Sequence, residues 1–509
     1  MQLESFLEQS AARFPDKTAL VAFGSGGARR FTYREMEARS NCAAHALIER
    51  GVQRGDRVAI QLDNSPEAAV SIFAILKAGA VFLVIHPSTK PEKLAYILED
   101  CGARLLITDS RREANSPGRT PVLLADADPT FQGEAFQDQA SNCQRPRKQC
   151  IDIDLAALIY TSGSTGKPKG VMLTHLNMVS AAASITEYLE NRPEDIIFNA
   201  LPFSFDYGLY QLLMAFKIGG TLVLERGFTF PRAVLDTVQR ENVTGLPLVP
   251  TMAALLLQLD WSGYNFPALR YITNTAAALP VQQIVRLRAL FPHVKIYSMY
   301  GLTECKRVSY LPPDQIDIRP KSVGKGMPNE EVYIVDEFGA PLGPGIPGEL
   351  VVRGSNVMKG YWNLPAETDK VLKPGKLPGE RVLYTGDLFI ADEEGYLYFI
   401  GRKDDIIKTR GEKVSPREVE EALYAIEGVA EAAVIGVPDS VLGEAIKAIV
   451  TLRTGAVLTE QQVQFQCSKR LEDFMVPKFV EFREGLPKSA NGKIDKRELA
   501  AMAESRGVQ

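Results

Sequence analysis

The sequence predicts an α/β protein: a large N-terminal domain of parallel α/β sheets plus a β-rich subdomain, followed by a small α+β C-terminal domain. Three observations predict this fold. Strands alternate with helices in the first third, short β-type runs fill residues 321–400, and an α+β pattern restarts after the charged stretch at 401–405. The 509 residues exceed what one hydrophobic core usually supports. We place the boundary near Asp404, which gives domains of residues 1–403 and 404–509.

The first third reads as successive βαβ units. DRVAIQL at 56–62 predicts a strand, DNSPEAAVSIFAILKAG at 63–79 an amphipathic helix that begins near Pro66, and AVFLVI at 80–85 a second strand. KPEKLAYILEDCG and ARLLITD continue with another helix and strand. Crossovers between parallel strands are right-handed, and such sheets bind ligands at the carboxyl ends of their strands.

Later segments predict a connection and the smaller domain. Residues 109–150 are polar and without a clear period, so we expect most of them to form a long surface connection. In the C-terminal part, Ser415 and Glu418 have the spacing of a capping box, with Pro416 at the first helical position. The strand-like runs AEAAVIGV and AIVTL and helices near 459–472 and 495–503 complete an α+β unit.

Composition excludes several classes of function. A formal net charge of −4 gives no basic field for nucleic acid, and no apolar stretch approaches the roughly 20 residues of a membrane-spanning helix. The N-terminus lacks the order of a signal peptide, so we expect a cytoplasmic protein. Six scattered cysteines and four scattered histidines predict neither a disulfide framework nor a transition-metal site.

The strongest local signal is the segment TSGSTGKPKG at 161–170, which follows a β-type run from Leu155 to Tyr160. A loop of Gly, Ser, Thr and Lys can surround phosphate oxygens with backbone N–H groups, hydroxyls and ammonium groups. It is not a Walker A loop, because that pattern requires Gly where Thr161 stands and Ser or Thr where Pro168 stands. The segment therefore predicts a phosphate site outside the P-loop NTPases.

This segment resembles the signature loop of the adenylate-forming superfamily, which includes acyl-CoA synthetases, peptide-synthetase adenylation domains and luciferases. Further motifs follow in the order expected for that superfamily, so the resemblance covers nearly the whole chain: NTAAALP at 274–280, YGLTE at 300–304, YTGDL at 384–388, GRKDDIIKTRGEKVSP at 401–416 and NGKID at 491–495. It implies that ATP and Mg²⁺ activate a carboxylic acid as its acyl-AMP. The acyl group then passes to the phosphopantetheine thiol of coenzyme A or of a separate carrier protein.

The resemblance also implies roles for individual residues. The small C-terminal domain is mobile in this superfamily, with Asp404 as the hinge and Gly411 in the thiol tunnel. Lys493 stabilises charge at the α-phosphate, Thr303 donates to the same phosphate, Glu304 binds Mg²⁺, and Lys167 completes the catalytic set. The residues that hold the nucleotide are Thr161, Ser162, Gly163, Ser164, Thr165, Gly166, Lys169, Thr275, Ala276, Ala277, Tyr300, Gly301, Asp387 and Arg402.

The identity of the acid depends on LPFSFDYGLYQ at 201–211. Amino-acid-activating members usually carry Asp where Asp206 stands, and a carboxylate there is a natural partner for an α-ammonium group. We therefore favour an amino acid, although Asp206 could instead be solvated or hydrogen-bonded within its loop. Arg307 could meet a polar substrate group, a protein carboxylate or solvent. The expected substrate residues are Asp206, Tyr207, Tyr210, Asn274, Met299 and Arg307, with Pro247, Ile272 and Val308 in the same lining.

Three alternatives remain open at this point. The first is an acyl-CoA synthetase for an acid without an amine, and the second is a luciferase-like oxidase. The third is a nucleotide-binding protein without catalysis, against which the presence of Lys493, Glu304 and Lys167 argues.

Overall fold

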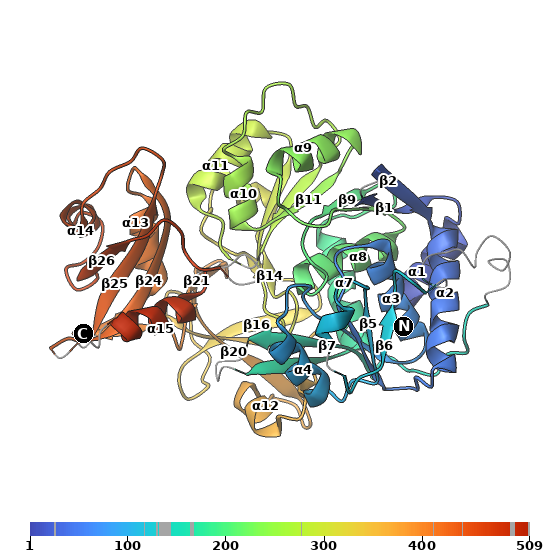
Figure 1. Cartoon of the computed structure of the whole chain (residues 1–509). Coiled ribbons are helices and arrows are strands. Elements are labelled where there is room, and N and C mark those ends of the chain that lie inside the picture. The colour runs from blue at the N-terminus through green and yellow to red at the C-terminus, as the bar shows by residue number, and fades with distance from the viewer. Residues whose placement is uncertain are drawn as a thin grey trace. The chain divides into compact units, whose positions relative to one another are not determined.

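The computed structural model describes residues 1–24, 27–116, 118–128, 131, 144–162, 167–275, 277–410, 412–439, 441–488 and 494–506. These residues form two compact units. The first contains Met1–Pro320, Gly326–Val332 and Val352–Leu383, and the second contains Lys321–Lys325, Tyr333–Val351 and Tyr384–Gln509. Figure 1 shows α/β layers in the first unit and a smaller α+β arrangement in the second. The predicted fold class is confirmed.

A nine-stranded sheet organises much of the first unit, in the order β15-β14-β13-β12-β11-β9-β10-β1-β2. Its central strands, from β1 to β13, pair in parallel, whereas β2 and β14 are antiparallel to their neighbours. The strands are β1 (Thr18–Gly24), β2 (Gly27–Thr32), β9 (Ile196–Asn199), β10 (Thr221–Leu224), β11 (Gly245–Leu248), β12 (Tyr271–Asn274), β13 (Lys295–Tyr300), β14 (Ser309–Tyr310) and β15 (Lys325–Gly326).

A seven-stranded sheet, in the order β18-β8-β7-β4-β3-β5-β6, contains the predicted βαβ units. The predictions for β3, β4, β5 and the helices between them are confirmed, and Ser65 caps α3 with Pro66 at its first position. Nearly all of α3 is buried, so the expectation of an amphipathic helix with one exposed face is wrong. The strands are β3 (Arg57–Ile60), β4 (Val81–Val84), β5 (Leu105–Thr108), β6 (Val122–Leu124), β7 (Leu155–Ser162), β8 (Pro168–Thr174) and β18 (Gly360–Tyr361).

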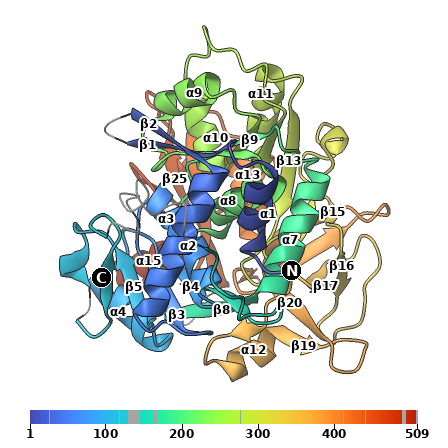
Figure 2. The ribbon, with the colours of Figure 1, turned by 90° about the vertical axis from the view of Figure 1, so that its right-hand side faces the viewer.

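Helices fill the space between and around these sheets. Helix α8 packs on β9 and β10, α7 packs on β7 and β8, and α7 contacts α8. Figure 2 turns α1, α2 and α7 toward the viewer. The helices of this unit are α1 (Ser5–Arg13), α2 (Tyr33–Glu49), α3 (Pro66–Lys77), α4 (Pro91–Asp100), α7 (His175–Tyr188), α8 (Asp206–Ile218), α9 (Pro231–Arg240), α10 (Pro250–Leu256), α11 (Val281–Leu290) and α12 (Pro365–Val371), with 3-10 turns at Glu113–Asn115 and Pro313–Gln315.

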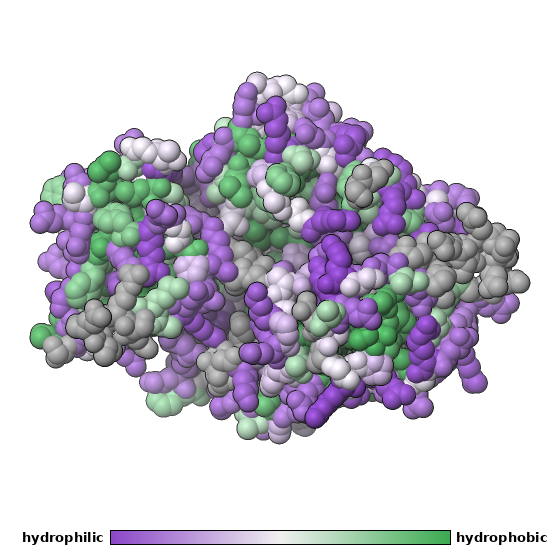
Figure 3. All heavy atoms as spheres, in the orientation of Figure 1, coloured by the Kyte–Doolittle hydropathy of each residue, from purple (hydrophilic) through white to green (hydrophobic). Residues whose placement is uncertain are grey.

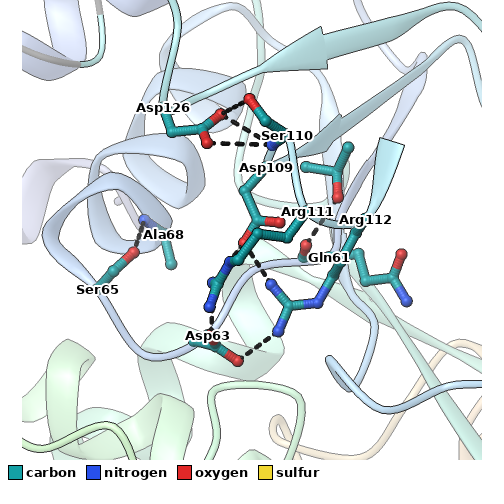
Figure 4. A network of polar contacts seen from close by, with 10 residues as sticks. Gln61, Asp63, Ser65, Ala68, Asp109, Ser110, Arg111, Arg112 and Asp126 are labelled. Atoms are coloured by element: carbon teal, nitrogen blue, oxygen red, sulfur yellow. Dashed lines mark hydrogen bonds and ion pairs between the residues drawn. The ribbon is translucent and has the colours of Figure 1, made fainter. Parts of the chain in front are cut away.

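Part of the expected surface connection at 109–150 belongs to the second sheet. Val122–Leu124 forms β6, which pairs in parallel with β5. Just after β5, Arg112 lies between two carboxylates, 2.6 Å from Asp63 and in contact with Asp109, and Arg111 bonds both as well (Figure 4). These ion pairs hold the end of β5 against the residues that follow β3.

The predicted β-rich region at 321–400 is also present. Its five-stranded sheet has the order β16-β17-β20-β19, with β21 paired to β20. Residues of both units occur in β16, β17 and β20. The strands are β16 (Glu330–Val335), β17 (Gly348–Gly354), β19 (Leu372–Pro374), β20 (Arg381–Ala391) and β21 (Leu397–Arg402).

The C-terminal part packs a sheet in the order β23-β22-β25-β24, plus β26, against three helices. Pro416 occupies the first position of its helix as predicted, but the expected capping box is absent. The Ser415 hydroxyl donates instead to the carbonyl of Ile400. The elements are β22 (Ile407–Thr409), β23 (Glu412–Val414), α13 (Pro416–Tyr424), β24 (Val429–Asp439), β25 (Gly443–Leu452), α14 (Glu460–Ser468), β26 (Phe479–Phe482) and α15 (Lys496–Arg506).

Two further properties concern the surface and the cysteines. Within the described ranges, no helix is long and apolar enough to cross a membrane. The face drawn in Figure 3 carries mostly hydrophilic side chains with scattered hydrophobic ones. Cys42 is disulfide-bonded, whereas Cys101, Cys150, Cys305 and Cys467 are free thiols.

Candidate active site

The predicted phosphate loop is carried by the antiparallel hairpin of β7 and β8. The β-type run extends past Tyr160 through Thr161 to Ser162, and the chain returns with Thr161 opposite Lys169 and Ser162 opposite Pro168. Gly163, Ser164, Thr165 and Gly166, and the side chain of Ser162, lie outside the described part of the chain. A hairpin anchored in a buried sheet fixes the two ends of this loop.

The two lysines of the hairpin have different environments. Lys169 Nζ lies 2.6 Å from a carboxylate oxygen of Glu367, and hydrogen bonds from Lys169 and Lys370 lower the pKa of Glu367 to about 2. Lys167 is exposed, with its ammonium 5.7 Å from the centre of the Tyr96 ring. Lys167 therefore has the more accessible charge for a phosphate.

The YGLTE segment forms a tight turn at the carboxyl end of β13. A Cβ at Gly301 would lie 2.4 Å from the carbonyl oxygen of Lys306, so only glycine lets the chain return this closely. Lys306 has a positive φ of 69°, which is uncommon for a residue with a side chain. Tyr300 and Thr303 are half-buried on this turn. The turn thus places four of the predicted residues, Tyr300, Gly301, Thr303 and Glu304, at the edge where parallel sheets bind ligands.

Glu304 is held in place by a residue distant in sequence. Its Oε1 accepts a 2.7 Å hydrogen bond from the Tyr361 hydroxyl, and its backbone carbonyl accepts one from Met358. An oriented carboxylate is a suitable ligand for Mg²⁺, which usually takes one or two protein carboxylates together with substrate phosphates. Among the described residues, no group of three or more His, Cys, Asp or Glu side chains could hold a metal alone. The donor set fits a Mg²⁺ ion that arrives with ATP.

The NTAAALP segment, which is expected to hold part of the nucleotide, begins at the neighbouring strand β12, which runs parallel to β13. Asn274 and Thr275 are buried at its end, and Ala277 is exposed; Ala276 lies outside the described residues. Asn274 donates to the carbonyl of Leu248 at 3.3 Å.

In the second unit, Asp387 and Arg402 are directly opposite on β20 and β21. Asp387 is buried and its Oδ1 lies 3.3 Å from the Arg402 guanidinium, while most of Arg402 is exposed. Gly386 has a positive φ of 71° and donates its N–H to Glu349. The two residues expected to bind the ribose are therefore in contact with each other.

Asp206 is the first residue of α8 and has a protein partner. Its Oδ2 lies 3.5 Å from the ammonium of Lys306, which is 3% exposed. That ammonium also sits 4.2 Å from the centre of the Tyr210 ring. Burial lowers the pKa of Lys306 to about 7, although Asp206 opposes this shift. Charged or neutral, the Lys306 amine is close enough to donate to Asp206.

The other expected substrate residues gather around the same helix. Tyr207 is buried and donates its hydroxyl to Thr273 on β12, and the Arg307 guanidinium lies 5.2 Å from the Tyr207 ring centre. Met299 on β13 accepts from the Tyr188 hydroxyl through its sulfur at 3.0 Å. Burial raises the pKa of Tyr207 and Tyr210 above the usual value, so both stay neutral.

Known proteins share this arrangement. The AMP-binding enzyme family model matches residues 7–362, and the model of the AMP-binding enzyme C-terminal domain matches residues 418–493. The chain belongs to the AMP-binding enzyme family. A long-chain-fatty-acid–CoA ligase of Bacillus subtilis is 33% identical over 98% of this chain and 94% of its own. Tyrocidine synthase 2 of Brevibacillus parabrevis is 30% identical over 98% of this chain and 14% of its own.

Solved structures of AMP-binding enzymes agree with this fold. An anthranilate CoA ligase in complex with anthranoyl-AMP superposes with a TM-score of 0.90 at 29% identity, over 100% of this chain and 98% of its own. ATP-bound MatB from Rhodopseudomonas palustris gives a TM-score of 0.87 at 30% identity, over 99% of this chain and 100% of its own. The predicted superfamily, its AMP-forming acid–thiol ligase chemistry and its use of ATP with Mg²⁺ are confirmed.

Several expected residues of this AMP-binding enzyme stay predictions. Lys493 and Gly411 lie outside the described residues, although Lys488 and Ile494 pair across the segment that contains Lys493. Asp404 is exposed in the turn between β21 and β22, inside the second unit. The boundary and the hinge at this position are untested.

Sequence reasoning missed Lys306 and Tyr361. The only local signal for Lys306 is the Lys-Arg pair directly after YGLTE, which reads equally well as a solvated turn. Tyr361 gives no sequence signal, because 57 residues separate it from Glu304.

Proposed function

We propose that this AMP-binding enzyme activates a carboxylic acid that lacks an α-ammonium group and transfers the acyl group to coenzyme A. The observation that carries the proposal is the contact of 3.5 Å between Asp206 and Lys306. It gives Asp206 an amine partner within the protein, in the place where an amino acid substrate was expected to supply one.

Electrostatics favours this choice. Lys306 and Arg307 are both almost completely buried, and Asp206 is the carboxylate that pairs with Lys306. A substrate ammonium bound to Asp206 would add a cation beside Arg307 and would have to displace the Lys306 amine from Asp206, and a buried charge without its own partner is costly. An acid without an amine avoids that cost.

The remaining roles follow the predicted residues. In the proposal, Glu304 binds the Mg²⁺ of ATP, Thr303 donates to the α-phosphate, and Lys167 binds phosphate from the hairpin. Asp387 and Arg402 bind the ribose, and Lys493 stabilises the negative charge that develops as the carboxylate attacks the α-phosphorus and pyrophosphate leaves. Supplying these groups from fixed positions lowers the barrier mainly by positioning and charge stabilisation.

The thiol acceptor in the proposal is coenzyme A. Relatives that match over nearly their whole length are named as CoA ligases, among them the Bacillus subtilis enzyme and the anthranilate CoA ligase. We place the reaction in the cytoplasm.

A second candidate is activation of an amino acid for a separate carrier protein. The carboxylate of Asp206 favours it, as does the similarity to tyrocidine synthase 2, of which this chain covers 14%. In that case Lys306 would have to release Asp206 when the substrate binds.

Matched acids distinguish the two candidates. The enzyme is incubated with ATP, Mg²⁺ and coenzyme A together with pairs that differ only in the amine, such as phenylalanine with 3-phenylpropanoate and leucine with 4-methylpentanoate. The proposal expects the amine-free acid of a pair to give AMP and an acyl-CoA, detected by mass spectrometry, at the higher rate. Preference for the amino acid, lost in Asp206→Asn without a change in ATP affinity, would establish the second candidate instead.

A further inference from the structure

The guanidinium of Arg307 is a buried cation without a counterion in the described structure. The side chain is 1% exposed, and its Nε and Nη1 have no hydrogen-bond partner among the described residues. Guanidinium groups are almost never buried without acceptors, because they carry five N–H donors and a permanent charge. An unpaired group of this kind points to a ligand.

The neighbouring polar groups do not fill this role. The Tyr207 hydroxyl bonds Thr273, the Tyr188 hydroxyl bonds the sulfur of Met299, and the Tyr210 hydroxyl faces the carbonyl of Met178. Each is directed to another protein atom. The Tyr207 ring contributes a cation–π contact at 5.2 Å, which offsets only part of the cost of burying the charge.

The nearby carboxyl groups are also engaged. Asp206 pairs with Lys306 at 3.5 Å. Glu330 is buried and accepts from Asn356, and burial raises its pKa well above the usual range. Arg307 is therefore the cation of this region whose guanidinium has no carboxylate paired to it among the described residues.

The position of Arg307 is fixed by the backbone. Asn356 donates to the carbonyls of Cys305 and Arg307, and Val308 donates to Tyr300 at the start of the turn back toward β14. A preorganised guanidinium loses little freedom when a planar acceptor binds, and it matches a carboxylate with two parallel hydrogen bonds.

We propose that the acid activated by this enzyme carries a second carboxylate, which binds the guanidinium of Arg307. The inference rests on the proposed function, because it identifies the substrate class of the same site. Arg307 thereby selects diacids over monoacids of equal length. A site built to bond a charged group rejects an analogue that lacks it, so we expect a preference of at least about 100-fold.

The experiment uses the full chain and acid-dependent exchange of pyrophosphate into ATP. Each diacid, in a series of aliphatic chain lengths and benzene dicarboxylates, is compared with its monomethyl ester and with the monoacid of the same length. The ester removes the second charge and keeps the shape nearly unchanged. We expect the kcat/KM of the best diacid to exceed that of its ester at least about 100-fold, and Arg307→Gln to reduce this ratio to near one. Arg307→Lys keeps the charge but not the two-bond geometry, so it retains part of the preference.

Two results separate this inference from the proposed function. Exchange that is as fast with esters or monoacids as with diacids, in the wild-type enzyme, overturns the role of Arg307 and leaves the proposed function intact. If neither the amine-free acids of the matched pairs nor the diacids support exchange while an amino acid does, the proposed function and the inference fail together. The wild-type comparison decides the matter even if Arg307→Gln does not fold.

Discussion

Removing the Tyr361 hydroxyl tests whether Glu304 acts as an oriented metal ligand. The 2.7 Å bond from the Tyr361 hydroxyl to Oε1 has the usual length of an O–H···O hydrogen bond. Such bonds to a charged group contribute about 1.5–3 kcal/mol. Since about 1.4 kcal/mol corresponds to a factor of ten in rate, full loss in the transition state slows the reaction roughly 10- to 100-fold.

The assay is pyrophosphate–ATP exchange by Tyr361→Phe over a range of Mg²⁺ concentrations. We expect a lower rate and a higher half-saturating Mg²⁺ concentration, because the released carboxylate leaves the orientation that octahedral Mg²⁺ requires. Tyr264→Phe is a matched control: it removes a 2.6 Å bond from the Tyr264 hydroxyl to the carboxylate of Asp236, which is exposed on α9 in the same unit. Exchange by Tyr361→Phe within twofold of wild type at every Mg²⁺ concentration would refute the reasoning.

Three further predictions follow from other contacts. Because burial lowers the pKa of Lys306 from 10.5 to about 7, the folded protein binds fewer protons than the unfolded chain between these values and gains stability as pH rises. Lys306→Met removes this titration, so the free energy of unfolding of the variant relative to the wild type should fall by up to about 1.4 kcal/mol per pH unit between pH 7 and 10; a difference that does not change with pH in denaturant titrations would contradict this. Gly301→Ala should destabilise the protein by about 1–3 kcal/mol and slow exchange, since its Cβ meets backbone at 2.4 Å, whereas Gly227→Ala, with open space around it, should do neither. Asp387→Asn should raise the KM for ATP roughly tenfold or more and leave the KM for the acid unchanged; equal changes in both would argue against a ribose contact.

Local sequence signals predicted the regular elements well. Ser65 and Pro66 mark the start of α3, and the apolar runs that flank it form β3 and β4. The prediction of a capping box at Ser415 failed because the Ser415 hydroxyl donates to the backbone carbonyl of Ile400 on β21. Strand β6 was missed since three residues carry no period, and only its pairing with β5 defines it.

The candidate site was predicted as a set of residues, not as a set of contacts. The motifs identified Asp206 and Arg307, but their charge environment depends on Lys306, one hundred residues after Asp206 and directly before Arg307. In the same way, the partner of Lys169 is Glu367, which no motif contains. Pairings of this kind depend on the tertiary fold, so a pattern of residues along the chain cannot supply them.

Acid-dependent exchange of labelled pyrophosphate into ATP, in the wild type and in Lys493→Ala, tests the central claim most directly. The account predicts that label enters ATP only when Mg²⁺ and a suitable acid are present, that AMP is released when coenzyme A is added, and that Lys493→Ala abolishes exchange while ATP still binds. ATP binding without exchange for any acid in the wild type, or exchange unaffected in Lys493→Ala, would contradict it.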